Sequence, residues 1–131
     1  MTRILKGTIL GAVATLAILP VSELRGQEAQ ARGQYVYVLQ VAPRFQEEAT
    51  WTETENAVIA RHFDRLVQAA KAGQVILAGR TDEPLDQTFG LVIFEADSEA
   101  AAREFMQDDP AVIAGLMTAT LHPYAVALQR K

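Results

Sequence analysis

Hydrophobic residues run almost without interruption through residues 34–43, which read QYVYVLQVAP. Valine, leucine and tyrosine dominate the run and a proline ends it, so the pattern predicts a β-strand. Tyr37 and Leu39 would lie on one face of this strand, and Val36 and Val38 on the other. Because both sets are apolar, we expect both faces of the sheet to be covered.

A helical spacing of apolar residues follows a polar connection at residues 44–56. Thr52 and Glu55 have the spacing of a capping box, which predicts that a helix begins near Glu53. Gly73 follows a lysine in the last expected turn and predicts the end of this helix. The apolar stripe expected to face inward consists of Ile59, Phe63, Leu66, Val67 and Ala70.

Two further apolar runs, at residues 74–79 and 91–96, predict two more strands joined by a polar, proline-containing connection of the hairpin type. Asp97 or Ser98 is then expected to cap a second helix. Pro110 ends that helix, because the residue before a proline is driven out of the helical conformation. The expected inward stripe consists of Ala101 and Phe105, with Ala102 and Met106 beside them.

A short turn leads from Pro110 to a last predicted strand over residues 117–128. Alternation along this strand separates an apolar face from a polar one. The apolar face carries Met117, Ala119 and Leu121, and the polar face carries Thr118, Thr120 and His122.

The predicted order of elements is therefore β-α-β-β-α-β. This is the ferredoxin-like pattern of an α+β domain, in which two helices cover one face of a four-stranded antiparallel sheet. The first and third strands are nevertheless apolar on both faces. We therefore expect a homodimer in which the two open sheet faces pack together.

The first 31 residues have the pattern of a secretory signal peptide. A positively charged start is followed by a short apolar run at residues 8–19 and by the small residues Ala29 and Ala31. The apolar run is shorter than the roughly 20 residues that cross a membrane, so no stable membrane anchor is expected. The prediction is an exported protein, periplasmic or secreted, with its domain at residues 35–131; an amphipathic or disordered N-terminus is the alternative.

Composition narrows the classes of function. The 131 residues carry a formal net charge of −4 and no basic patch interleaved with aromatic residues, so a nucleic-acid partner is not expected. The chain has no cysteine, which excludes disulfides and thiolate metal sites. The two histidines lack metal-site spacing, and neither a phosphate-binding loop nor a nucleophile elbow occurs. We therefore expect neither a metal nor another cofactor.

Two residues are candidates for acid/base chemistry. His62 falls at the edge of the expected apolar stripe, where an imidazole is half-buried; it is either a proton-transfer group or a boundary residue without a role. Asp109 directly precedes Pro110 and is either an ordinary turn former or a carboxylate that orients a histidine. No constellation of functional groups surrounds His122 or Arg80 in the sequence.

Three stretches of the chain resemble the YciI-like, or YCII-related, family: HFDRLVQAAKAGQVILAGRTDE, GLVIFEADSEAAAREFMQDDPAVIAGL and LHPYAVAL. The likeness runs over roughly residues 35–128. It implies a dimeric α/β barrel, in which ferredoxin-like protomers pair through their sheets, and a His–Asp pair as the active site. Carried over, that pair is His62 and Asp109. The chain departs from the family in its expected export, in a longer connection at residues 44–56 and in Arg80, where the family often has proline.

Two classes of function stay open at this point. One is a cofactor-independent enzyme of the lyase, isomerase or dehalogenase type, in which His62 transfers a proton of a small organic molecule and Asp109 orients the imidazole. The other is a module of the same fold that binds a small ligand or a partner without catalysis.

Overall fold

The computed structural model describes residues 31–130. The predicted signal peptide at residues 1–31 lies, apart from its last residue, outside this described part of the chain. Among residues 31–130, no helix has the length and apolar character needed to cross a membrane.

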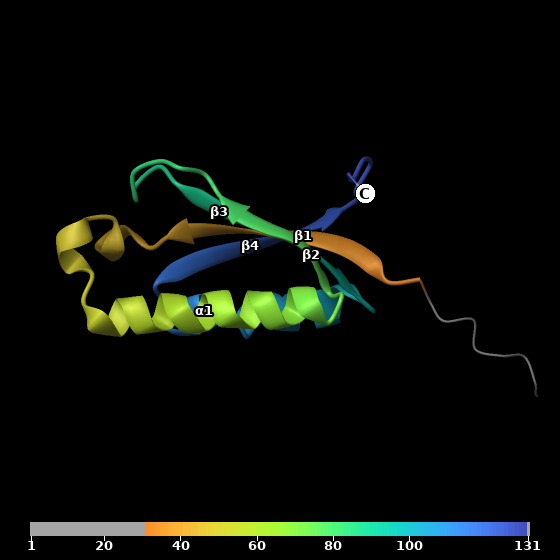
Figure 1. Cartoon of the computed structure of the whole chain (residues 1–131), viewed down its shortest axis with the longest axis horizontal. Coiled ribbons are helices and arrows are strands. Elements are labelled where there is room, and N and C mark those ends of the chain that lie inside the picture. The colour runs from red at the N-terminus through yellow and green to blue at the C-terminus, as the bar shows by residue number, and fades with distance from the viewer. Residues whose placement is uncertain (1–30, 131) are drawn as a thin grey trace, which may run out of the picture.

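Four antiparallel strands form a single sheet with the spatial order β2-β3-β1-β4. The strands are β1 (Gly33–Val41), β2 (Val75–Arg80), β3 (Phe89–Ala96) and β4 (Met117–Tyr124). The strand β1 lies inside the sheet and pairs with both β3 and β4. Figure 1 shows the long helix α1 (Glu53–Lys71) running along one face of the sheet. This arrangement confirms the predicted ferredoxin-like α+β fold.

The helix α1 begins where the sequence predicts. The hydroxyl of Thr52 accepts a hydrogen bond from the backbone N–H of Thr54, and the carboxylate of Glu55 accepts one from the backbone N–H of Thr52. This capping box satisfies donors that the first helical turn leaves free. After the helix, Gly73 has a φ of 78°, a left-handed conformation that glycine adopts without strain.

The second half of the chain differs from the prediction in one element. Ser98, rather than Asp97, caps the helix α2 (Glu99–Gln107) by accepting a hydrogen bond from a backbone N–H. The expected turn after it contains a short helix, α3 (Pro110–Ile113), with Asp109 as its N-cap. Proline is well suited to the first helical position, because its fixed φ matches that of a helix. The backbone N–H that proline lacks would have no hydrogen-bond partner within the helix at this position.

Two smaller expectations are also corrected. The last strand ends at Tyr124 rather than at residue 128. Tyr124 pairs with Gln34 near the beginning of β1, so the residues after Tyr124 have almost no strand to pair with. The polar connection before α1 contains two short 3₁₀ helices, η2 (Pro43–Phe45) and η3 (Glu48–Thr50).

The main core lies between the sheet and the helices. Tyr37 and Phe94 are completely buried, and their rings meet edge to face with centroids 5.6 Å apart. The ring of Phe105 on α2 lies against that of Phe94, with a centroid distance of 4.8 Å. Met106 of α2 and Leu66 of α1 complete this contact between the layers. The inward stripe of α2 is therefore close to the one predicted.

The predicted inward stripe of α1 is only partly buried. Leu66 is 6% exposed, whereas Phe63 is 63% exposed and Ala70 is also exposed. The buried positions of this helix are Val58, Leu66 and Ala69. All members of the predicted stripe line a pocket beside the core, and Phe63 and Ala70 are its exposed members.

Candidate functional site

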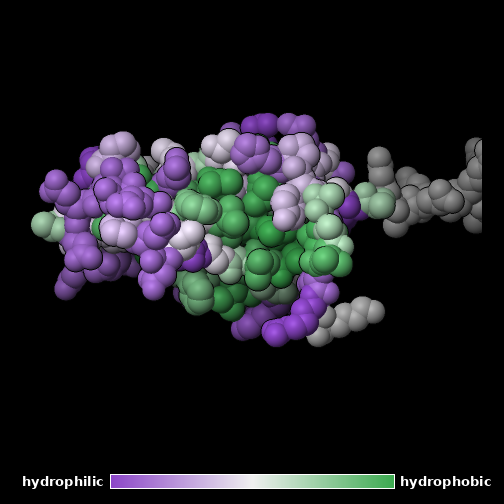
Figure 2. All heavy atoms as spheres, turned by 90° about the horizontal axis from the view of Figure 1, so that it is seen from above, coloured by the Kyte–Doolittle hydropathy of each residue, from purple (hydrophilic) through white to green (hydrophobic). Residues whose placement is uncertain are grey.

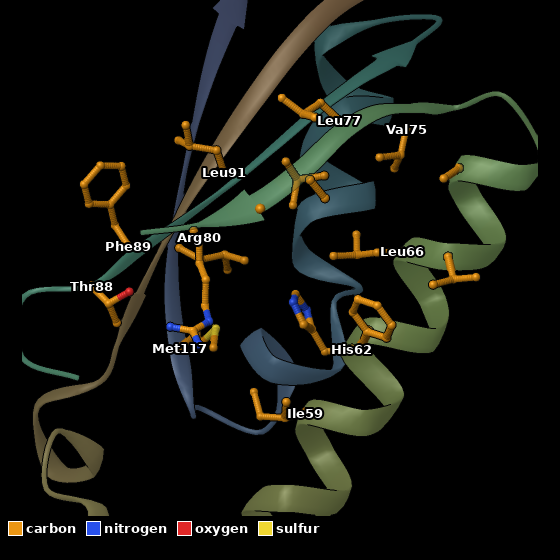
Figure 3. A pocket seen from close by; sticks show the side chains of 18 of the residues that line it. Ile59, His62, Leu66, Val75, Leu77, Arg80, Thr88, Phe89, Leu91 and Met117 are labelled. Atoms are coloured by element: carbon orange, nitrogen blue, oxygen red, sulfur yellow. The ribbon is translucent and has the colours of Figure 1, made fainter. Parts of the chain in front are cut away.

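A pocket of about 600 Å³ lies between α1 and the sheet (Figure 3). Its walls come from α1, β2, the beginning of β3 with the residue before it, two residues of β1 and one residue of β4. The lining is almost entirely aliphatic or aromatic, with Ile59, Leu66, Val75 and Met117 among its members. This volume and lining are typical of pockets that take small organic ligands, which span roughly 300–1,000 Å³.

His62 is the residue of this lining that is tied to a buried carboxylate. Its Nδ1 lies 2.8 Å from Oδ1 and 2.9 Å from Oδ2 of Asp109. The side chain of His62 is 13% exposed, and that of Asp109 is fully buried. The two residues are 47 positions apart and meet because α1 packs against α3. The structure thus brings together the two candidates that the sequence analysis selected.

The hydrogen bond determines which nitrogen of His62 carries a proton. An ionised carboxylate only accepts hydrogen bonds, so Nδ1 must be the N–H donor to Asp109. In a neutral imidazole the other nitrogen, Nε2, is then an acceptor. Since His62 lines the pocket with its ring (Figure 3), Nε2 is the nitrogen available to a bound molecule.

Asp109 is held by two further donors. The backbone N–H of Ala111 donates to Oδ1 at 2.9 Å, which is the N-cap bond of α3. The hydroxyl of Tyr37 donates to Oδ2, also at 2.9 Å. Each carboxylate oxygen therefore receives a bond from His62 and one from another donor. This explains the Asp-Pro sequence: the same carboxylate begins a helix and orients the imidazole.

The electrostatics of Asp109 favour its charged form. Burial alone would raise the pKa of its carboxyl, but the hydrogen bond and charge of His62, the N–H of Ala111 and the hydroxyl of Tyr37 outweigh burial and lower the pKa. Burial raises the pKa of Tyr37, and the neighbouring Asp109 charge raises it further. Tyr37 is thus a neutral donor to an ionised acid.

Arg65 supports this arrangement from the next turn of α1. Its guanidinium lies 4.1 Å from the centroid of the Phe105 ring and donates to the backbone oxygen of Phe105 at 2.7 Å. These contacts tie α1 to α2 beside the buried Tyr37. Among the described residues, Nη1 of Arg65 is a buried atom without a hydrogen-bond partner.

Two residues of the site were not predicted from the sequence. Tyr37 was placed only as a strand residue, although a tyrosine on a buried face usually requires a partner for its hydroxyl. Arg80 lines the pocket at the end of β2, on the same face as Ala78. Alternation along β2 is the signal that would have placed Arg80 on that face.

His122 lies elsewhere and does not join this group. It is exposed on β4, where it pairs with Val36 on the sheet face opposite the helices. Within residues 31–130, no three His, Cys, Asp or Glu side chains are grouped as metal ligands. The arrangement around His62 is suited to proton transfer: an oriented imidazole with one free nitrogen, in a largely apolar pocket.

Comparisons with known proteins agree with this fold. Residues 27–121 match the family model of the YCII-related domain. A comparison with curated proteins finds no match. Among solved structures, the chain is similar to 5-chloro-2-hydroxyhydroquinone dehydrochlorinase from Burkholderia phenoliruptrix AC1100 in complex with 2,5-dihydroxybenzoquinone. The TM-score is 0.53 at 19% identity, over 70% of this chain and 93% of the other. At this identity the likeness shows the shared fold alone.

Proposed function

The chain belongs to the family of YCII-related domains, and we propose that it is a cofactor-independent acid/base enzyme acting on a small organic molecule. The observation that carries this proposal is the contact of His62 with Asp109, at 2.8 Å, on the wall of an apolar pocket of about 600 Å³. An oriented imidazole that faces a largely apolar pocket is suited to general acid/base catalysis.

In the proposed mechanism, Nε2 of His62 takes a proton from an acidic C–H or O–H bond of the substrate. The electron pair left behind can expel a leaving group such as halide, which is an elimination, or the proton can return at another carbon, which is an isomerisation. Asp109 keeps Nδ1 protonated and stabilises the imidazolium that forms. The name and the bound quinone of the structurally similar dehydrochlorinase support a substrate with a hydroxylated ring.

Halide release and proton exchange test this proposal. A panel of chlorinated hydroxyhydroquinones and enolisable ketones is incubated with the wild type and with His62→Gln, and chloride and deuterium uptake are followed. We expect His62→Gln to lower the rate of the best substrate by roughly 10²–10⁴-fold, the usual contribution of general acid/base catalysis. The control is Arg61→Gln, which alters an exposed residue of α1 that does not line the pocket and should leave the rate unchanged. Equal rates for wild type and His62→Gln would contradict the proposal.

The second candidate is a non-catalytic module that holds a small ligand in the same pocket. It is favoured by the lining, in which His62 and Arg80 are the only residues with an ionisable side chain among those described. A single acid/base group is sufficient for binding and for one proton transfer, but it limits the reactions available. Saturable binding without turnover across the panel, retained in His62→Gln, would favour this candidate over the enzyme.

The proposal includes a homodimer formed through the open face of the sheet. Figure 2 shows a broad apolar area on this face, which α1 and α2 do not cover. By the strand register, Val38 of β1 and Leu91 of β3 are neighbours on it, and Leu77 of β2 is 62% exposed. Leu91 and Leu77 also belong to the pocket lining, so the open face and the pocket share these two residues. Exposed apolar areas of this kind mark interaction sites, and a second copy of the same sheet would cover it symmetrically.

Export also remains part of the proposal. Its support is the signal-peptide pattern of residues 1–31, with a positive start, a short apolar run and an Ala-x-Ala motif. We propose that the domain acts in the periplasm or outside the cell.

A further inference from the structure

We propose that Arg80 makes the pocket a binding site for an organic anion, that is, a flat apolar molecule bearing one ionised oxygen substituent. The inference rests on the proposed function only in assuming that the pocket holds a ligand. It assigns the ligand's charge, which neither the family nor the similar structure assigns to this chain.

The first observation is that few polar side chains line the pocket. Three described lining residues have side chains with nitrogen or oxygen atoms: His62, Arg80 and Thr88. The Thr88 hydroxyl is already occupied, because it donates to the backbone oxygen of Thr81 at 2.8 Å and lies 3.2 Å from the hydroxyl of Thr81. A ligand therefore meets two available polar groups, an imidazole and a guanidinium, on an otherwise apolar surface.

The charge of the lining is the second observation. Among the described residues that line the pocket, none is acidic. The carboxylate of Asp109 lies behind His62 and is fully buried, so it does not face the ligand. Within residues 31–130, no carboxylate forms an ion pair with Arg80. An anionic oxygen in the ligand would supply the missing partner for the guanidinium.

The position of Arg80 is the third observation. Arg80 is the last residue of β2 and lies opposite Gly90 of β3, so no side chain lies directly across from it on β3. Its exposed guanidinium makes one described contact, a 3.2 Å hydrogen bond from Nη1 to the backbone oxygen of Thr81. In the view of Figure 3 the Arg80 side chain extends from β2 toward the end of the pocket where the His62 ring lies.

These observations define a two-ended site. The apolar body of the ligand would lie along α1 and the sheet, its ionised oxygen at Arg80, and its reactive hydrogen at Nε2 of His62. Arginine is suited to this role, because its planar fork of N–H donors matches a carboxylate and stays charged at all physiological pH values. The charged group and the reacting group of the ligand would thus be bound separately.

Binding of a matched pair of probes tests the inference. 2-Naphthoate and 2-naphthamide share two fused rings and differ in carrying a carboxylate or a neutral amide. Isothermal titration of the wild type should show roughly tenfold tighter binding of the acid, the scale of one charge-assisted hydrogen bond. Arg80→Gln should remove this preference while leaving the affinity for the amide unchanged, and Arg80→Lys should retain part of it.

The matched control is Arg61→Gln, which removes the same charge from an exposed residue of α1 that does not line the pocket. It should leave the preference intact. The His62→Gln variant should also retain a preference that depends on Arg80, because binding requires no proton transfer. An inactive protein that still binds the acid through Arg80 would thus separate failure of the proposed reaction from failure of this inference.

Three results would overturn the inference. They are equal affinity of the wild type for the acid and the amide, an acid preference that survives Arg80→Gln, and no binding of either probe at millimolar concentration. Circular dichroism checks that each variant is folded. Substitution of Arg80 should leave the fold intact, because this residue is exposed at the end of a strand.

Discussion

The hydroxyl of Tyr37, at the centre of the sheet, donates a hydrogen bond to Oδ2 of Asp109 at 2.9 Å. The two residues are 72 positions apart, and both are completely buried. Through this bond the strand β1 holds the carboxylate that in turn orients His62 on α1. The sheet and the helices therefore both determine the orientation of the imidazole. The geometry of the His62–Asp109 pair depends on a hydrogen bond inside the core.

Removal of the Tyr37 hydroxyl should destabilise the protein. In Tyr37→Phe the carboxylate of Asp109 loses one of its donors inside the core, so we expect the free energy of unfolding to fall by about 1–3 kcal/mol. Denaturant titration measures this change. The control is Tyr35→Phe, at a partly buried tyrosine of the same strand whose hydroxyl makes no hydrogen bond to the described residues. Equal losses in the two variants would contradict a specific role for the Tyr37 bond.

Stability should depend on pH through Asp109. Its pKa is lowered in the folded protein, so the unfolded chain binds the proton first as the pH falls. The stabilisation is therefore complete above the ordinary aspartate value of about 3.9 and is lost as the pH falls through the folded pKa. We expect wild type to exceed Asp109→Asn in unfolding free energy at neutral pH, and this difference to shrink below about pH 4.

Denaturant titrations of wild type and Asp109→Asn at several pH values measure that difference. Asp108→Asn is the control: Asp108 is exposed, so its substitution should change the unfolding free energy at neutral pH by less than about 0.5 kcal/mol. A difference between wild type and Asp109→Asn that is the same at pH 7 and pH 3 would show that the carboxylate contributes no charge-dependent stability.

Two residues three positions apart on α1 should respond differently to truncation. Leu66 is 6% exposed and packs in the core, so Leu66→Ala should lower the unfolding free energy by about 2–5 kcal/mol. Phe63 is 63% exposed on the pocket wall, so Phe63→Ala should cost less than about 1 kcal/mol and instead weaken ligand binding. Denaturation and probe binding of both variants check this. A large loss of stability in Phe63→Ala would mean that the pocket wall is part of the core.

If the protein is a homodimer, a substitution in the interface should lower its mass in solution from that of a dimer to that of a monomer. An aspartate at Val38, in the middle of the open sheet face, would place a charge in the interface, so Val38→Asp should be monomeric or insoluble. Light scattering at micromolar concentration should give a dimer for the wild type. The control is Ala60→Asp, at an exposed position of α1 that is outside the sheet. A folded wild-type monomer under these conditions would exclude the dimer.

Export predicts a processed N-terminus. Protein recovered from outside the cytoplasm of its native host should begin near Arg32, because the Ala-x-Ala motif ends at Ala31. Intact-mass measurement decides this. A mass that includes Met1 would show that residues 1–31 are retained and would weaken the prediction of export.

The elements of the fold could be predicted from the sequence because they depend on neighbours in the chain. Thr52 and Glu55 cap the beginning of α1 by hydrogen bonds between residues at most three positions apart. Gly73, just after the end of α1, adopts a left-handed backbone conformation that turns the chain. Alternation along β1 and β4 likewise follows from strand geometry alone. The order of these elements then predicts the ferredoxin-like arrangement, which the structure confirms.

What Asp109 and His62 contact was decided by tertiary structure. The resemblance to a family selected both residues, but the sequence left Asp109 as either a turn former or a partner of His62. In the structure it is both, since one carboxylate caps α3 and accepts bonds from His62 and Tyr37. The bond from Tyr37 is invisible in the sequence, because it joins residues 72 positions apart.

Burial was also decided by tertiary structure. Phe63 and Leu66 share an apolar stripe in the sequence, yet only Leu66 meets the core, while Phe63 faces the pocket. Arg80 joins the pocket because β2 ends beside β3 opposite Gly90. Periodicity along the chain determines the face on which a side chain lies. Whether that face is filled by the core or left open for a ligand depends on the elements packed opposite, which come from distant parts of the sequence.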